Sequence, residues 1–101
     1  MKPRVRVEER VRDFLHALAP EPRRAIWQAI KKLPAGDVKL LEGKLSGWSR
    51  LRVSGYRVLL KETSSSGERQ IRCEFAERRS VVYEMFAELL ANELAGEEKK
   101  A

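Results

Sequence analysis

The hydrophobic residues change their spacing along the chain, and each spacing predicts a different element. Val5 and Val7 alternate with charged residues, which predicts a short strand over residues 4–7. The spacing then becomes helical over residues 8–19 and 21–34, and prolines punctuate the ends of both segments. Because so few residues join these two helices, we expect them to form an antiparallel hairpin.

The second half of the chain returns to the two-residue alternation of strands. It predicts strands over residues 48–53, 56–62 and 70–76, after a loop over residues 34–47. Ser54-Gly55 fits a two-residue hairpin turn, and residues 63–69 read as a flexible turn. A last helix begins near Ser80. We therefore predict one α+β domain over residues 1–95, in the order β-α-α-β-β-β-α, and a flexible polar tail over residues 96–101. The helical hairpin should pack on one face of a small, mostly antiparallel sheet.

A turn at Ser54-Gly55 fixes which side chains share a face of the sheet. Directly paired residues lie on the same face, and successive residues alternate. The face expected under the helical hairpin carries Leu51, Val53, Tyr56, Val58 and Leu60, joined from the third strand by Ile71, Cys73 and Phe75. The opposite face carries Arg50, Arg52, Arg57 and Lys61, with Arg72 from the third strand and Trp48 at its edge.

The opposite face is unusual because Arg52 and Arg57 would face each other directly across the hairpin. Like charges in that position repel each other, and a bound anion would turn the repulsion into attraction. Guanidinium groups form a planar fork that matches phosphate. The face therefore predicts phosphate binding. The alternative is a solvated surface whose arginines splay into water or pair with Glu62 and Glu74.

Composition narrows the classes of partner. The 101-residue chain carries 21 Lys and Arg against 15 Asp and Glu, and its net charge of +6 favours an anionic partner such as a nucleic acid or an acidic protein. No apolar run is long enough for a membrane span, so we expect a cytoplasmic protein with no membrane partner. With one cysteine (Cys73) and one histidine (His16), we expect no metal and no small-molecule cofactor.

Two segments resemble the RelE/ParE superfamily of toxins from type II toxin–antitoxin systems. Residues 41–59 read LEGKLSGWSRLRVSGYRVL, with two glycine-spaced leucines before the arginine hairpin, and residues 78–83 read RRSVVY. The order of the elements around them is also similar. The resemblance implies an α+β fold and a toxin that an acidic antitoxin wraps and inhibits. The RelE branch implies metal-independent cleavage of mRNA on the ribosome, and the ParE branch implies inhibition of DNA gyrase.

The same resemblance assigns expected roles to particular residues. Arg57 matches a strand arginine that contacts the scissile phosphate, and Tyr83 matches a tyrosine that stacks on or orients the nucleotide. Arg50 stands where related toxins carry a catalytic lysine. The sequence departs from the pattern where Trp48 replaces a second lysine and Glu77 replaces an arginine. A related subgroup uses a glutamate, for which Glu42 is the nearest match, together with a C-terminal histidine that this chain lacks.

These residues suit charge stabilisation better than proton transfer. Cleavage through the 2′-hydroxyl needs a base, an acid and cations that stabilise the charged phosphorane. We expect Arg50, Arg57 and Tyr83 to be catalytic, and Glu77 to be a candidate for proton transfer. Further contacts to RNA phosphate or bases are expected from Arg52, Lys61, Arg72, Arg78, Arg79 and Trp48.

Three functions remain open on this reading. The first is a ribosome-dependent mRNA endoribonuclease, the second a gyrase inhibitor without nuclease activity, and the third a toxin-like domain that is not toxic. The last helix adds an apolar stripe that either packs on the chain's own core or binds the antitoxin, formed by Val82, Phe86, Leu89 and Leu90.

Overall fold

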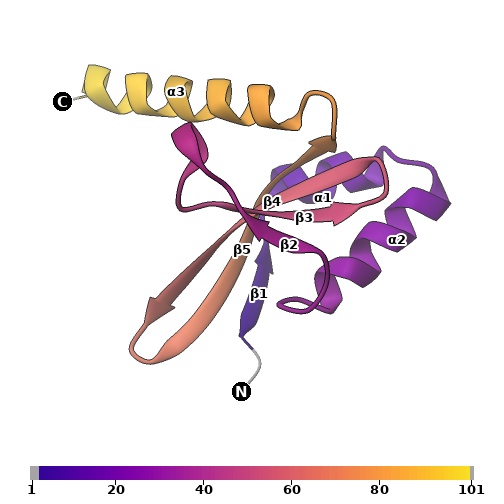
Figure 1. Cartoon of the computed structure of the whole chain (residues 1–101). Coiled ribbons are helices and arrows are strands. Elements are labelled where there is room, and N and C mark those ends of the chain that lie inside the picture. Colours follow the sequence, from indigo (N-terminus) through magenta and orange to yellow (C-terminus); the bar gives the residue numbers. More distant parts are fainter. Residues whose placement is uncertain (1–2, 101) are drawn as a thin grey trace.

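A computed structural model describes residues 3–100, including the side chains of residues 3–96. Five strands form one sheet in the order β1-β5-β4-β3-β2, in which β1 is parallel to β5 and every other pair is antiparallel. Three helices complete the α+β fold (Figure 1). The elements are β1 (Arg4–Val7), α1 (Glu9–His16), α2 (Pro20–Lys31), β2 (Val38–Leu40), β3 (Ser49–Val53), β4 (Tyr56–Ser65), β5 (Glu68–Arg78) and α3 (Val82–Lys100).

The first half of the chain follows the predicted pattern. Pro20 and Pro22 occupy the first turn of α2, where a proline lacks only a hydrogen bond that the helix would not form. The apolar stripes of α1 and α2 cover one face of the sheet and form the larger core, which contains Val11, Leu15, Ile26, Ile30, Leu33, Leu51, Val58, Leu60, Ile71, Cys73 and Ala76. We call this side of the sheet the hairpin face.

The β3–β4 hairpin has the predicted register. Val53 pairs with Tyr56 and Arg52 pairs with Arg57. The turn is Ser54-Gly55, although the left-handed φ falls on Ser54 (54°) rather than on Gly55. The connection that was expected to be a flexible turn over residues 63–69 instead extends both strands and reverses at Ser66-Gly67, where both residues have positive φ (52° and 80°).

The prediction that Phe75 lies under the helical hairpin is wrong. Leu59 pairs with Phe75 and Leu60 with Cys73, so Glu74 is an extra residue in β5. Such a bulge reverses the alternation of side chains beyond it. Phe75 therefore lies on the opposite face of the sheet, and Ala76 takes the place in the larger core.

A second, smaller core forms on that opposite face, which we call the α3 face. Val82 and Phe86 of α3 are buried there against Leu45 and Leu59. Partly buried residues around them are Leu41, Trp48, Phe75, Ala87, Leu89 and Leu90. Leu45 comes from a 3₁₀ turn (Gly43–Leu45) in the segment predicted as a loop, which also contains β2. The sheet is therefore covered on both faces.

The backbone of α3 stays helical to Lys100, beyond the start of the predicted polar tail at residue 96. Glutamate, lysine and alanine favour helices, and a single glycine costs only about 1 kcal/mol relative to alanine. Residue 101 lies outside the described residues. Within the described part of the chain, no helix is long and apolar enough to cross a membrane.

Candidate nucleic-acid interface

The β3–β4 hairpin places a row of charged residues on the α3 face, next to its turn. Arg52 pairs with Arg57 across the hairpin, and Arg57 pairs in turn with Glu77 of β5. The two arginines are therefore direct cross-strand neighbours, as the sequence predicts. Their mutual repulsion persists until an anion or a carboxylate lies between them.

Asp37 is an acidic partner that the sequence analysis missed. Its carboxylate lies 3.2 Å from Nη1 of Arg50 and 3.6 Å from Nε of Arg52. Arg50 also donates to the backbone oxygen of Asp37 at 3.1 Å, and only 15% of its side chain is exposed. A cation that is this buried needs such partners. The Gly36-Asp37 turn in the sequence was the only available signal for this residue.

Arg57 is held by the turn rather than by a carboxylate. Its Nη1 donates to the backbone oxygen of Ser54 at 2.9 Å and to that of Tyr56 at 2.8 Å. Carbonyl groups orient the guanidinium without cancelling its charge. The side chain of Glu77, its cross-strand neighbour, instead accepts a hydrogen bond from the backbone N–H of Arg78 at 3.0 Å.

The C-terminal end of β5 brings further positive charge to the same turn. Arg78 pairs with Tyr56, and the backbone N–H of Arg79 donates to the oxygen of Gly55 at 2.9 Å. Both arginines are exposed, and Tyr83 follows in the first turn of α3 with 36% of its surface exposed. The structure therefore places Arg50, Arg52 and Arg57 on one face of the hairpin and Arg78 and Arg79 beside its turn. The carboxylates among them are those of Asp37 and Glu77. We call this group, Arg50, Arg52, Arg57, Arg78 and Arg79, the arginine site.

The other predicted contacts lie apart from the arginine site, beyond the α3 core. Trp48 packs edge-on against Phe86, with ring centroids 4.7 Å apart, and Nζ of Lys61 lies 5.1 Å from the Trp48 ring. Trp48 therefore takes the packing role that the sequence had left open. Arg72 lies 3.5 Å from Glu8 and 3.4 Å from Glu74, so carboxylates balance its charge. RNA binding by Trp48, Lys61 and Arg72 stays a prediction.

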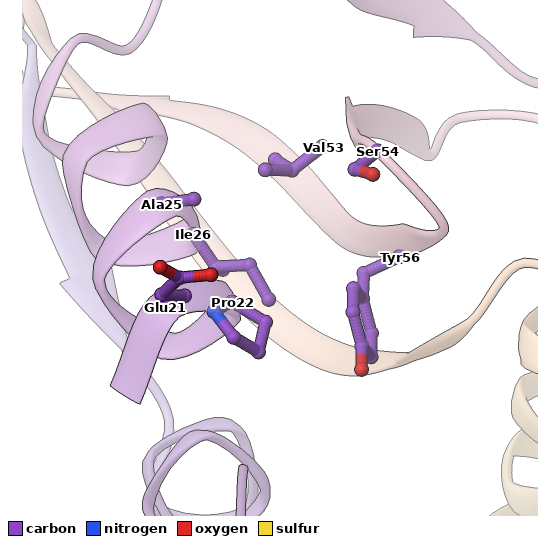
Figure 2. A pocket seen from close by; sticks show the side chains of 7 residues that line it. All are labelled: Glu21, Pro22, Ala25, Ile26, Val53, Ser54 and Tyr56. Atoms are coloured by element: carbon purple, nitrogen blue, oxygen red, sulfur yellow. The ribbon is translucent and has the colours of Figure 1, made fainter. Parts of the chain in front are cut away.

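Within the described residues, no group of three His, Cys, Asp or Glu side chains could hold a metal ion. A cavity of about 300 Å³ lies on the hairpin face, between α2 and the β3–β4 turn (Figure 2). Its lining is mainly apolar and contains none of the arginines: Glu21, Pro22, Ala25, Ile26, Val53, Ser54 and Tyr56. The candidate interface is thus the exposed arginine site rather than an enclosed pocket.

Solved structures decide the fold. A chain of the toxin–antitoxin complex RelBE2 from Mycobacterium tuberculosis superposes with a TM-score of 0.65 at 22% identity, over 78% of this chain and all of that one. The YoeB/ParE toxin from Agrobacterium tumefaciens gives a TM-score of 0.59 at 16% identity, over 75% of this chain and 98% of that one. This chain has the RelE/ParE toxin fold. No family model and no curated protein sequence matches it.

The RelE/ParE fold confirms the predicted α+β architecture. The role of α3 has to be argued from this chain. Each solved structure leaves more than a fifth of this chain without a counterpart. Val82 and Phe86 are buried on the sheet, and Leu89 and Leu90 pack beside them. Antitoxin binding through these four residues stays a prediction, and it would require α3 to leave the sheet.

Proposed function

We propose that the protein is the toxin of a type II toxin–antitoxin system and cleaves mRNA on the ribosome. The observation that carries this proposal is the cross-strand pair of Arg52 and Arg57. Arg50 lies on the same face, and Arg78 and Arg79 lie beside the turn. Such a group suits the phosphodiester of an RNA chain, because its planar donors match phosphate oxygens. The RelE/ParE fold supports the proposal, and the toxin would act in the cytoplasm, where ribosomes translate.

In the proposed reaction, the arginine site stabilises charge while other groups move protons. The 2′-hydroxyl attacks the adjacent phosphate, and the guanidinium of Arg57 binds the extra negative charge of the phosphorane, with Arg50 and Arg52 beside it. Arginine stays protonated, so it does not act as the base. Tyr83 and Glu77 are the groups of the site that can take or give a proton. Because Glu77 is already bonded to a backbone N–H, we expect slow cleavage that depends on the ribosome.

The proposed inhibitor is an acidic antitoxin, which suits the net charge of +6. The RelBE2 structure is itself a complex of toxin and antitoxin. In this proposal, the antitoxin helix binds where Val82, Phe86, Leu89 and Leu90 now pack.

The test is mRNA cleavage in a translating extract, mapped by primer extension. We expect Arg57→Ala to lower the cleavage rate by roughly 10²–10³-fold, the typical effect of losing one donor to a transition-state charge. Arg12→Ala removes an exposed arginine from α1, away from the arginine site, and should change the rate less than twofold. Intact mRNA in an extract whose protein synthesis has stopped would refute the nuclease.

A gyrase-directed toxin without nuclease activity is the second candidate. Two observations favour it: Trp48 is packed where a catalytic lysine is expected, and both carboxylates of the site already have partners. A supercoiling assay with purified DNA gyrase separates the two functions. Inhibition at micromolar protein together with intact mRNA would support this candidate, and undisturbed supercoiling would exclude it. Expression that causes no growth arrest would support the third possibility, a non-toxic domain of this fold.

A further inference from the structure

The outer surface of α2 carries a second group of positive charges, far from the arginine site in the sequence. Its residues recur at intervals of three and four, so they share one side of the helix. They line a depression of about 320 Å³, formed by Pro20, Arg23, Arg24, Trp27, Gln28 and Lys31. We call this surface the α2 patch.

The charge of the α2 patch is not neutralised by the chain itself. Elsewhere carboxylates pair with Arg6, Arg10, Arg50, Arg52, Arg69 and Arg72. Among the described residues, no carboxylate lies within 4.0 Å of the charged nitrogens of Arg23, Arg24 or Lys31. Arg23 has only a long hydrogen bond, at 3.5 Å, to the backbone oxygen of His16. The one acidic residue of α2, Glu21, lines the cavity beside the β3–β4 turn instead (Figure 2).

Trp27 lies between these cations and is held in place from below. It packs against the larger core and also lines the depression, so its ring is half-buried and fixed. Arg23 precedes it by about one helical turn and Lys31 follows it by about one turn. A fixed indole flanked by cations offers a stacking surface for a base and contacts for the phosphates on either side.

We infer that the α2 patch binds an RNA backbone, with Trp27 stacking on a base. Arg23 and Lys31 are eight residues apart, which is about 12 Å along a helix, enough to span several phosphates of a strand. Cations on both sides of one fixed ring match a stacked base flanked by its phosphates, and this match favours RNA over an acidic protein. RNA uses both features of the patch.

The α2 patch and the arginine site belong to opposite sides of the sheet. α2 covers the hairpin face, whereas Arg50, Arg52 and Arg57 of the arginine site lie on the α3 face. The chain can therefore hold one RNA segment at each side. This inference goes beyond the proposed cleavage and does not depend on it.

The test measures binding of the full-length protein to a 12-nucleotide uridine RNA by fluorescence anisotropy across a range of salt concentrations. We expect the triple variant Arg23→Ala/Arg24→Ala/Lys31→Ala to bind at least tenfold more weakly. Its log–log salt slope should be shallower by about 2, because each lost phosphate contact removes about 0.7 from the slope for a single strand. Unchanged affinity and slope would overturn the inference.

A matched control removes the same net charge elsewhere. Arg4→Ala/Arg12→Ala/Lys44→Ala replaces three exposed cations outside α2 and should lower the affinity less than twofold. An equal loss in both triple variants would show that overall charge, rather than the α2 patch, binds RNA. Thermal unfolding of both variants checks that each is folded before binding is compared.

Stacking has its own readout. RNA should quench part of the tryptophan emission of the wild-type protein, and Trp27→Phe should remove that part while the fold is retained. Quenching that persists in Trp27→Phe would overturn the stacking. Polyglutamate is the probe for an acidic protein. If it quenches Trp27 and binds the α2 triple variant more weakly, as expected for RNA, the patch would be assigned to an acidic protein. RNA binding at the patch by a protein that cleaves no mRNA would separate this inference from the proposed function.

Discussion

The two faces of the same five-stranded sheet are built differently. On the hairpin face, two helices cover an unbroken apolar surface, and none of the charged residues that the structure describes is buried there. On the α3 face, Leu59 and Phe75 form an apolar middle under α3, and arginines occupy the end next to the β3–β4 turn. The comparison shows that the hairpin face only packs against helices, whereas the α3 face both packs against a helix and carries exposed charge.

The two faces should therefore respond differently to mutation. A residue in the larger core has buried neighbours from two helices and the sheet. A residue in the α3 core has partly buried neighbours and depends on one helix. We therefore expect mutations on the hairpin face to affect the whole molecule and mutations on the α3 face to affect the site first.

The largest expected effect is on the hairpin face. Leu15→Ala leaves a cavity in the larger core, because Leu15 is fully buried. It should lower the free energy of unfolding by about 4 kcal/mol, measured by urea denaturation. Leu94→Ala makes the same chemical change at an exposed position of α3 and should cost little. Similar losses for both variants would contradict the assignment of the core.

The next effect concerns the α3 core. Phe86→Ala removes the ring that contacts Trp48 and Phe75, and it should lower the free energy of unfolding by about 3 kcal/mol. Hydrogen exchange should show that α3 loses protection while β3–β5 keep theirs, because these strands also pack in the larger core and α3 does not. Met85→Ala, on the exposed side of the same helix, is the control. Uniform loss of protection would show that both faces unfold as one unit.

Burial of Cys73 on the hairpin face should make the stability of the protein depend on pH. Burial, reinforced by the nearby charge of Glu74, raises the pKa of the Cys73 thiol from 9.0 to about 12. Between pH 9 and 12 the unfolded chain loses this proton and the folded chain keeps it, so stability falls by about 1.4 kcal/mol per pH unit. Below pH 9 the contribution is constant. In Cys73→Ala this component of the decline should disappear, and parallel curves for the two proteins above pH 9 would contradict the prediction.

The smallest expected effect tests how the α3 face handles charge. Asp37→Asn frees Arg50 and Arg52 from a carboxylate while it keeps the backbone contacts of residue 37. Affinity for RNA should rise about threefold, because the exposed ion pair of Arg52 with Asp37 is worth at most about 1 kcal/mol. Asp13→Asn on α1 makes the same change away from the arginine site. A drop in affinity would mean that Asp37 positions the arginines rather than competing with RNA.

The sequence predicts this fold well where local patterns are strong, and less well where contacts between distant segments decide. The Ser54-Gly55 turn fixes the register of β3 and β4, so the Arg52–Arg57 pair follows from alternation alone. The bulge at Glu74 has no local signal, because a charged residue there fits the alternation equally well. Because of the bulge, Phe75 lies on the α3 face and contributes to the α3 core.

The arginine site was predicted in part. Arg50, Arg52 and Arg57 share the expected face, and Arg79 reaches the same turn through a backbone hydrogen bond. Asp37 could not be foreseen, because it joins the site from the turn that precedes β2. The sequence also predicts that Lys61 and Arg72 belong to this phosphate-binding face. That prediction took no account of α3, which covers the middle of the face, or of the carboxylates of Glu8 and Glu74, which pair with Arg72.

The sequence by itself determined the elements, the hairpin register and the concentration of arginine, because turn residues and side-chain periodicity act over a few neighbours. The tertiary structure alone decided which cations are paired with a carboxylate and which are not. The ion pair between Arg72 and Glu8, for example, joins elements that are far apart in the sequence. Helix α3 covers apolar residues in the middle of a face that the alternation of residues predicts to be polar. What remains exposed and positive, at the arginine site and at the α2 patch, is the surface available to an anionic partner.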